Sequence, residues 1–521
     1  MSLSVLVLER PGRWRLAGLS FVIAVSLLPT LPLILAIREN APWATLNVPG
    51  FLPLLIKSLA ISFSGAAAAL VLGLCKGVFF SLYEYRAKRL FLFLFIIPIM
   101  VPPLLWSVSF NNLSFYFRLI SMHKTVCLVF ITAMVTLPLV AASTVSACQT
   151  LTSSQCEAVR LTAGETRLFW LCLRFAFPPA AVAACLGAFG MLASPGPAMG
   201  LGLKTAISEI LVSFSALYDM KLASAQCVML SASTLALASF VLLVSGKRPM
   251  ELLASSSKRL QPSFQGKMST LAFVFSLLCS VLLVLIPCGA LLFPAFTLPD
   301  VSLLARTLSR TLPYSLLYSA GSALVALFLG FALAFFMGRF NLTRTIGMSA
   351  MLVIFSLPPS LTALGFVYSA AQAPPWLDFI FRSPISVCMA QGFRLFPVPA
   401  LLAARYFASL PPSWAYAAEI QDISLKRFSF KVLSPLACKT LLTGFLLVFL
   451  LSGADVATVL LIHPPGGQNL PLAIFTIMAN APRGQVAQLC SLYLALATIF
   501  LASISAIWNR GKTWKSYQAS Y

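Results

Sequence analysis

The sequence predicts an all-α polytopic membrane protein, and three observations lead to this fold class. Of the 521 residues, 60% are hydrophobic and only 9% are charged, and the mean hydropathy is +0.94. Apolar runs of about 20 residues, the length that a helix needs to cross the hydrocarbon layer, recur along the whole chain. This composition excludes a soluble globular protein. A transmembrane β-barrel is excluded because its strands would read as short alternating segments.

Twelve segments are candidates for membrane-spanning helices, six on each side of a polar stretch near residues 246–268. They are residues 16–37, 58–82, 90–110, 125–148, 178–194, 223–245, 271–294, 313–336, 346–370, 384–407, 435–452 and 486–508. With the N-terminus inside, the inner segments hold more than twice as many Lys and Arg as the outer ones. This bias explains the net charge of +23 and predicts that both termini are cytoplasmic. The first segment is read as an uncleaved span rather than a signal peptide.

The two groups of six spans are related by an internal repeat with an offset of 257 residues. Residues 58–73 match residues 315–330 at half of their positions, including Ser58 with Ser315 and Gly73 with Gly330. The same offset places Pro102 on Pro359, Pro178 on Pro435 and Gly196 on Gly453. Because six spans return the chain to the same side, the repeats are expected to be parallel. They cover residues 1–248 and 269–521, joined by a cytoplasmic linker at residues 249–268.

Two predicted cytoplasmic loops, one in each repeat, have related sequences. The first contains Glu157, Ala158, Gly164 and Glu165 and reaches Pro178; the second contains Ala417, Ala418, Glu419 and Asp422 and reaches Pro435. Both resemble the EAA loop of ABC importer permeases, with Tyr416 at the Glu place and Asp422 at the Gly place of the second copy. The resemblance implies that these loops couple the chain to an ATPase, as short helices that dock into it. Ordinary basic loops are the alternative interpretation.

The segments that follow the fifth and eleventh spans are rich in Gly and Pro. Ser452-Gly453-Ala454-Asp455, followed by a Pro-Pro-Gly turn, resembles the fused two-repeat ABC importer permeases for ferric iron and for thiamine, and residues 194–202 are a looser version. Irregular backbone at membrane depth is tolerated where it lines a cavity. We therefore expect a translocation path lined by Ser194, Gly196, Ser452, Gly453 and Asp455, with plain external loops as the alternative.

No catalytic, cofactor or metal site is predicted in this chain. Gly511-Lys512-Thr513 lacks the preceding glycine of a P-loop, so ATP is expected to be used by partner subunits. The 12 cysteines have no metal-ligand spacing and are read as small buried apolar residues.

The resemblance implies the transmembrane permease subunit of an ABC importer in the bacterial inner membrane. It would move a small solute, ferric iron as first candidate and thiamine as second, from periplasm to cytoplasm. Two copies of a cytoplasmic ATP-binding subunit and a periplasmic solute-binding protein are the implied partners, with no nucleic acid. The alternative is a twelve-helix ion-coupled secondary transporter, which usually needs a carboxylate inside the membrane; none of the 13 acidic residues is predicted at mid-span.

Overall fold

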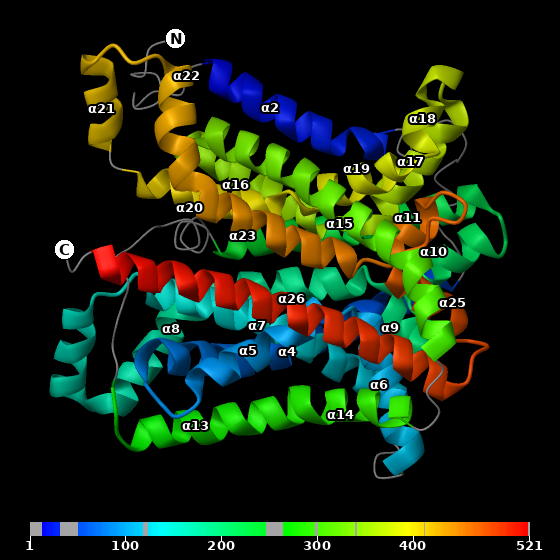
Figure 1. Cartoon of the computed structure of the whole chain (residues 1–521), viewed down its shortest axis with the longest axis horizontal. Helices are drawn as coiled ribbons and strands as arrows, with labels where there is room; N and C mark the ends of the chain where they lie inside the picture. The colour runs from blue at the N-terminus through cyan, green and yellow to red at the C-terminus, as the bar shows by residue number, and fades with distance from the viewer. Residues whose placement is uncertain are drawn as a thin grey trace.

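The computed structural model describes residues 13–31, 50–117, 123–245, 264–296, 301–338, 341–410 and 412–518. Within these ranges the chain is helical, without a β-strand; one isolated backbone bridge joins Tyr83 to Phe264. The long helices lie roughly parallel in one bundle, and the short helices gather at its two ends (Figure 1). This is the architecture expected of a multi-pass membrane protein, in which each helix satisfies its own backbone hydrogen bonds.

The first half of the chain forms ten helical elements in the described ranges. They are α2 Arg13–Leu27, η1 Leu28–Thr30, α4 Phe51–Leu82, α5 Lys88–Met100, α6 Pro103–Phe117, α7 Lys124–Cys148, α8 Ser153–Leu192, α9 Pro195–Gly200, α10 Ala206–Ser215 and α11 Met220–Ser245.

The second half repeats this order with more interruptions. Its elements are α13 Lys267–Ser280, η3 Val281–Leu285, α14 Ile286–Leu292, η4 Phe293–Phe296, α15 Val301–Met337, α16 Asn341–Ser356, α17 Pro359–Gln372, η5 Pro375–Leu377, α18 Asp378–Phe381, α19 Pro384–Leu395, α20 Pro397–Ser409, α21 Pro412–Ile420, α22 Leu425–Phe428, η6 Ser429–Leu433, α23 Ser434–Gly453, α24 Ala457–Ile462, α25 Leu470–Ile477 and α26 Arg483–Gln518. Most of the predicted linker, residues 249–263, lies outside the described residues.

The expected count of twelve spans is not confirmed. In the described part, eight helices are long and apolar enough to cross a membrane, or eleven if each of three bent pairs is one span. The first candidate is described only to residue 31, as a shorter apolar helix, Trp14–Thr30. The prediction that both termini are cytoplasmic stays a prediction.

Three candidate spans are bent pairs of helices rather than single straight helices, and each pair remains a candidate for one span. Residues 90–110 divide into α5 and α6, which meet at 101°; α16 and α17 meet at 81°, and α19 and α20 at 49°. Each second helix begins with proline, which lacks an N–H and so removes a backbone hydrogen bond at the break. At the first bend the Trp106 indole donates to the Pro98 carbonyl at 3.2 Å, which satisfies one backbone acceptor left by the break.

The internal repeat has a direct structural counterpart at the serine pair. Ser58 Oγ in α4 accepts a hydrogen bond from the Ala206 N–H at the start of α10, at 2.9 Å. Ser315 Oγ in α15 accepts from the Leu470 N–H at the start of α25, also at 2.9 Å. In each half, the repeated serine therefore satisfies a backbone donor that a helix start would otherwise leave unpaired.

The first helix of each half packs against the other half. α2 lies on α15 and α16, where the Trp14 ring contacts Phe336 at 6.1 Å between centroids. α13 and α14 lie on α4, α5 and α6, where Ser109 Oγ donates to the Pro287 carbonyl at 2.6 Å and Asn112 Nδ2 to the Ala290 carbonyl at 3.2 Å. Figure 1 shows these crossed helices on opposite edges of the bundle. Each half is thus held to the other by the packing of its first helix.

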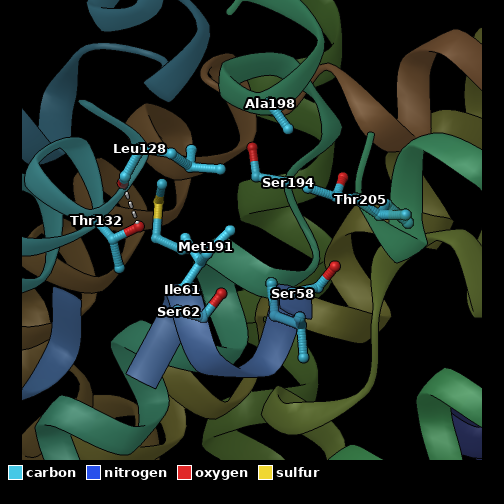
Figure 2. Close-up of a pocket in the computed structure, with 11 residues that line it drawn as sticks. Ser58, Ile61, Ser62, Leu128, Thr132, Met191, Ser194, Ala198 and Thr205 are labelled. Carbon is cyan, nitrogen blue, oxygen red and sulfur yellow. Dashed lines mark hydrogen bonds between the residues drawn. The ribbon is translucent and has the colours of Figure 1, made fainter. Parts of the chain in front are cut away.

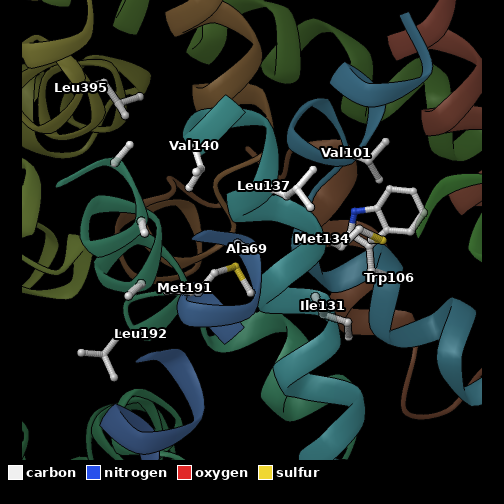
Figure 3. Packing of buried hydrophobic residues seen from close by; sticks show 14 of the residues in the cluster. Ala69, Val101, Trp106, Ile131, Met134, Leu137, Val140, Met191, Leu192 and Leu395 are labelled. Carbon is white, nitrogen blue, oxygen red and sulfur yellow. The ribbon is translucent and has the colours of Figure 1, made fainter. Parts of the chain in front are cut away.

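The apolar core of the first half is built around α7. Ile131, Met134 and Leu137 are at most 1% exposed and lie close to Ala69 of α4 and to Trp106 (Figure 3). Small residues permit this packing: a Cβ on Gly73 would lie 2.7 Å from Val140 Cγ1. At the repeated position in the second half, a Cβ on Gly330 would lie 2.7 Å from the Ala400 backbone nitrogen. Close helix contact at these two glycines explains why the repeat retains them.

Candidate functional site

The first predicted coupling loop is a helix that runs directly into the next span as the beginning of α8. Thr152 caps it: its Oγ1 accepts from the Gln155 N–H, and the Gln155 side chain accepts from the Thr152 N–H. The helix bends at Gly164, whose φ of 83° and ψ of 167° are essentially restricted to glycine. Glu157 and Ala158 are exposed on the turns before this bend.

Glu165 is held inside the chain by an ion pair across the bend. Its Oε1 accepts from Arg160 Nη2 at 2.5 Å and from Nε at 2.9 Å. The same guanidinium lies 4.4 Å from the centre of the Phe264 ring, and the Phe264 backbone pairs with the chain just after α4. Burial, and then the nearby Glu165 carboxylate, raise the pKa of Tyr83 to about 12. The ion pair between Arg160 and Glu165 thus connects the two sides of the bend at Gly164.

The second predicted coupling loop is formed by α21 and α22 with a turn between them. Asp422 occupies the turn with a φ of 49°, the left-handed conformation that Asp tolerates better than most residues. It is the counterpart of Gly164, as the sequence comparison predicted. Ala418 is buried with Phe428 and Leu433 in a small apolar cluster of its own, whereas Ala417 is exposed. Glu419 lies on α21.

The two loop helices present the same pattern of exposed residues. Leu161 is 87% exposed and Ile420 is 86% exposed, and the two positions are 259 residues apart. Ala158 and Ala417, three residues earlier on the same faces, are also exposed and have the same separation. Both helices project from one end of the bundle, on the left in Figure 1. The sequence analysis missed Leu161 and Ile420, because both helices contain several apolar residues and only the structure shows which of them are exposed.

A cavity of about 260 Å³ lies between the two halves, bordered by all three helix bends. Met100 and Pro103 line it at the first bend, Phe355 and Pro359 at the second, and Arg394 and Val398 at the third. The predicted path residues Ser194 and Asp455 also line it. The structure thus places three helix breaks at the wall of this cavity.

The other predicted path residues lie beside this cavity rather than on its wall. Ser452 is fully buried, and its Oγ donates to Gln391 Oε1 at 2.5 Å. A Cβ on Gly453 would lie 3.0 Å from Ser319 Oγ, and one on Gly196 would lie 2.9 Å from Leu104 Cβ. These glycines therefore permit close packing behind the wall.

A second, much smaller pocket of about 20 Å³ lies inside the first half (Figure 2). Its wall includes five hydroxyl side chains: Ser58, Ser62, Thr132, Ser194 and Thr205. This volume suits a single water molecule with several polar partners. Ser194 is shared with the larger cavity.

Among the described residues, no group of three or more His, Cys, Asp or Glu is placed to hold a metal ion. All 12 cysteines are free thiols.

Residues 326–511 match the model of a family described as the binding-protein-dependent transport system inner membrane component. Searches of curated proteins and of solved structures gave no match to the chain. The matched region begins in α15 and ends in α26, so it includes α21, α22 and the second-half wall of the cavity. By this match, residues 326–511 are similar in sequence to inner membrane components of binding-protein-dependent transport systems.

Proposed function

We propose that this chain is a fused ABC importer permease in which residues 1–248 and 269–521 are two repeats that form the pore together. The observation that carries the proposal is the pair of loop helices at one end of the bundle, with Leu161 and Ile420 both exposed, each three residues after an exposed alanine. Two equivalent docking helices on one chain suit two copies of a cytoplasmic ATP-binding subunit. ATP is used by those subunits, and the chain is not an ATPase.

The mechanism follows from the arrangement of loops and cavity. When the ATPases close on ATP, they draw the two loop helices together; hydrolysis releases them. α8 joins the first loop to the cavity wall across the bend at Gly164: Gly187, near the far end of α8, and Ser194, just beyond that end, both line the cavity. The bends at the cavity absorb the movement, so that the pore opens alternately outward and inward.

The remaining partners and the location follow from the same proposal. A periplasmic solute-binding protein delivers a small solute at the end opposite the loop helices, and the complex lies in the bacterial inner membrane. Ferric iron is the first candidate solute and thiamine the second, on the resemblance of the segment around Asp455.

Reconstitution tests this proposal against the ion-coupled alternative. The chain is placed in proteoliposomes with the ATPase and binding protein encoded beside it, and uptake of ferric citrate and of thiamine is measured. We expect uptake to require internal ATP and to be insensitive to a protonophore, and the chain alone to hydrolyse no ATP. Uptake driven by a proton gradient without the ATPase would establish the secondary transporter instead.

A further inference from the structure

The cavity between the halves contains two charged side chains in a wall that is otherwise mostly apolar. They are Arg394, at the end of α19, and Asp455, between α23 and α24. At each bend the C-terminus of one helix, which carries a partial negative charge, meets the N-terminus of the next helix, which carries a partial positive charge. The two partial charges largely cancel. The electrostatic character of the cavity is therefore set by these two residues.

The Asp455 carboxylate is already well supplied with donors. Its Oδ2 accepts from Thr458 Oγ1 at 2.5 Å and from Gln391 Nε2 at 3.4 Å, and its Oδ1 accepts from the Thr458 N–H at 3.3 Å. Asp455 thus caps α24 and anchors the neighbouring network. Its bonding capacity is mostly used within the protein.

Arg394 is in the opposite situation. Its Nε is buried and has no hydrogen-bond partner, and within the described part of the chain it makes no ion pair with Asp455. A guanidinium stays charged in proteins and offers five donors. Leaving the buried Nε–H unpaired in an apolar wall is costly. Thr136 Oγ1, on the wall contributed by α7, is likewise buried without a partner.

Only the second repeat carries a charged residue at the position of Arg394. The repeat offset places Arg394 on Leu137, which is 1% exposed in the core of the first half (Figure 3). Leucine thus satisfies the packing at this position in the first half. In the second half, the Asp455 carboxylate is close enough to interact electrostatically with Arg394, but it forms no ion pair with the guanidinium and leaves Arg394 Nε without a hydrogen-bond partner.

We propose that Arg394 binds an anionic group of the transported solute in this cavity, with the Thr136 hydroxyl as a second donor. The inference rests on the proposed permease function and narrows its substrate class to small solutes with a carboxylate, phosphate or sulfate group. Ferric iron would then pass as an anionic chelate, and thiamine, a cation, would not be the solute.

A larger cavity at the end opposite the loop helices supports this assignment. It has a volume of about 630 Å³, and among the described residues its wall includes Lys124 and Arg483 and no acidic residue. The Arg483 guanidinium lies 3.7 Å from the centre of the Phe115 ring, which holds the charge in place. A basic mouth raises the local concentration of anions before they reach the central cavity.

The test is calorimetric binding to the full chain in nanodiscs, without the ATPase. The probes are citrate, sulfate and inorganic phosphate, with thiamine as the cationic probe, at constant ionic strength in chloride. We expect saturable binding of at least one anion and weaker or no binding of thiamine. Arg394→Gln should lower the anion affinity about tenfold or more, and Arg394→Lys should lower it less because the charge remains.

Arg405→Gln is the matched control. Arg405, in α20, donates to Ser146 Oγ at 3.3 Å and does not line the cavity, so anion binding should be unchanged. Any one of three results would overturn the inference. The first is that no anion binds; the second is that the Arg394→Gln variant, the Arg394→Lys variant and the parent chain bind the anion with equal affinity; the third is that thiamine binds more strongly than the anions. Since no ATPase is present, these outcomes leave the permease proposal intact; that proposal fails only through uptake independent of the ATPase.

Discussion

Replacing Leu161 and Ile420 by serine tests whether the two loop helices dock on an ATPase. Full burial of a Leu or Ile side chain is worth about 1.5 to 3 kcal/mol. Leu161 is 87% exposed and Ile420 is 86% exposed, so nearly all of that gain is still available to a partner. Burial of both side chains would contribute about 3 to 5 kcal/mol, which corresponds to a loss of affinity in the double variant of roughly one hundred- to several thousand-fold.

The assay is the dissociation constant of the ATPase subunit for the permease in nanodiscs, with thermal unfolding of the permease as a second measurement. Serine at two solvent-exposed positions should leave the unfolding temperature unchanged, because neither side chain packs within the chain. Trp376→Ser is the control: Trp376 is 71% exposed beside α18, at the other end of the bundle (Figure 1). Unchanged ATPase affinity in the double variant would refute the docking role, as would an equal loss in Trp376→Ser.

Three further predictions concern the repeat, the loop turns and the topology. Ser58→Ala and Ser315→Ala should each lower the free energy of unfolding by about 1 to 2 kcal/mol, because each leaves the N–H at a helix start without its acceptor. A loss of stability in only one of the two variants would contradict the structural repeat. Gly164→Ala should lower the free energy of unfolding by about 1 to 3 kcal/mol and weaken ATP-driven uptake, because the turn requires a positive φ. Asp422→Gly should leave the free energy of unfolding unchanged or raise it for the same reason. Similar unfolding temperatures in both variants would count against these turns. A cysteine at Trp376 should react with an impermeant maleimide from the periplasmic side, and reaction from the cytoplasmic side would reverse the topology.

Composition and hydropathy determined the secondary structure and the class of this protein. Runs of about 20 apolar residues have no alternative to the helix in a lipid environment, because every backbone group must be satisfied within its own segment. The repeat was also visible in the sequence, and the equivalence of Asp422 with Gly164 follows from local backbone chemistry. Both residue types tolerate a positive φ.

The bends, by contrast, were decided by tertiary structure. Proline pairs stand at 102–103 and 358–359, where the helices break, but Pro178 and Pro179 lie inside α8, which bends at Gly164 and not at these prolines. Proline removes one hydrogen bond in each case; whether the helix then breaks depends on what satisfies the freed carbonyls. At the first bend this is Trp106, which donates to the Pro98 carbonyl.

The contents of the central cavity could likewise be seen only in three dimensions. In the sequence, Arg394 is one basic residue among 36 Lys and Arg, and Thr136 is more than 250 positions away from it. Folding brings both to one cavity and leaves Arg394 Nε and Thr136 Oγ1 without partners. Residue type fixes how many hydrogen bonds a side chain can make, but only the packing of distant helices decides which of them stay unmade.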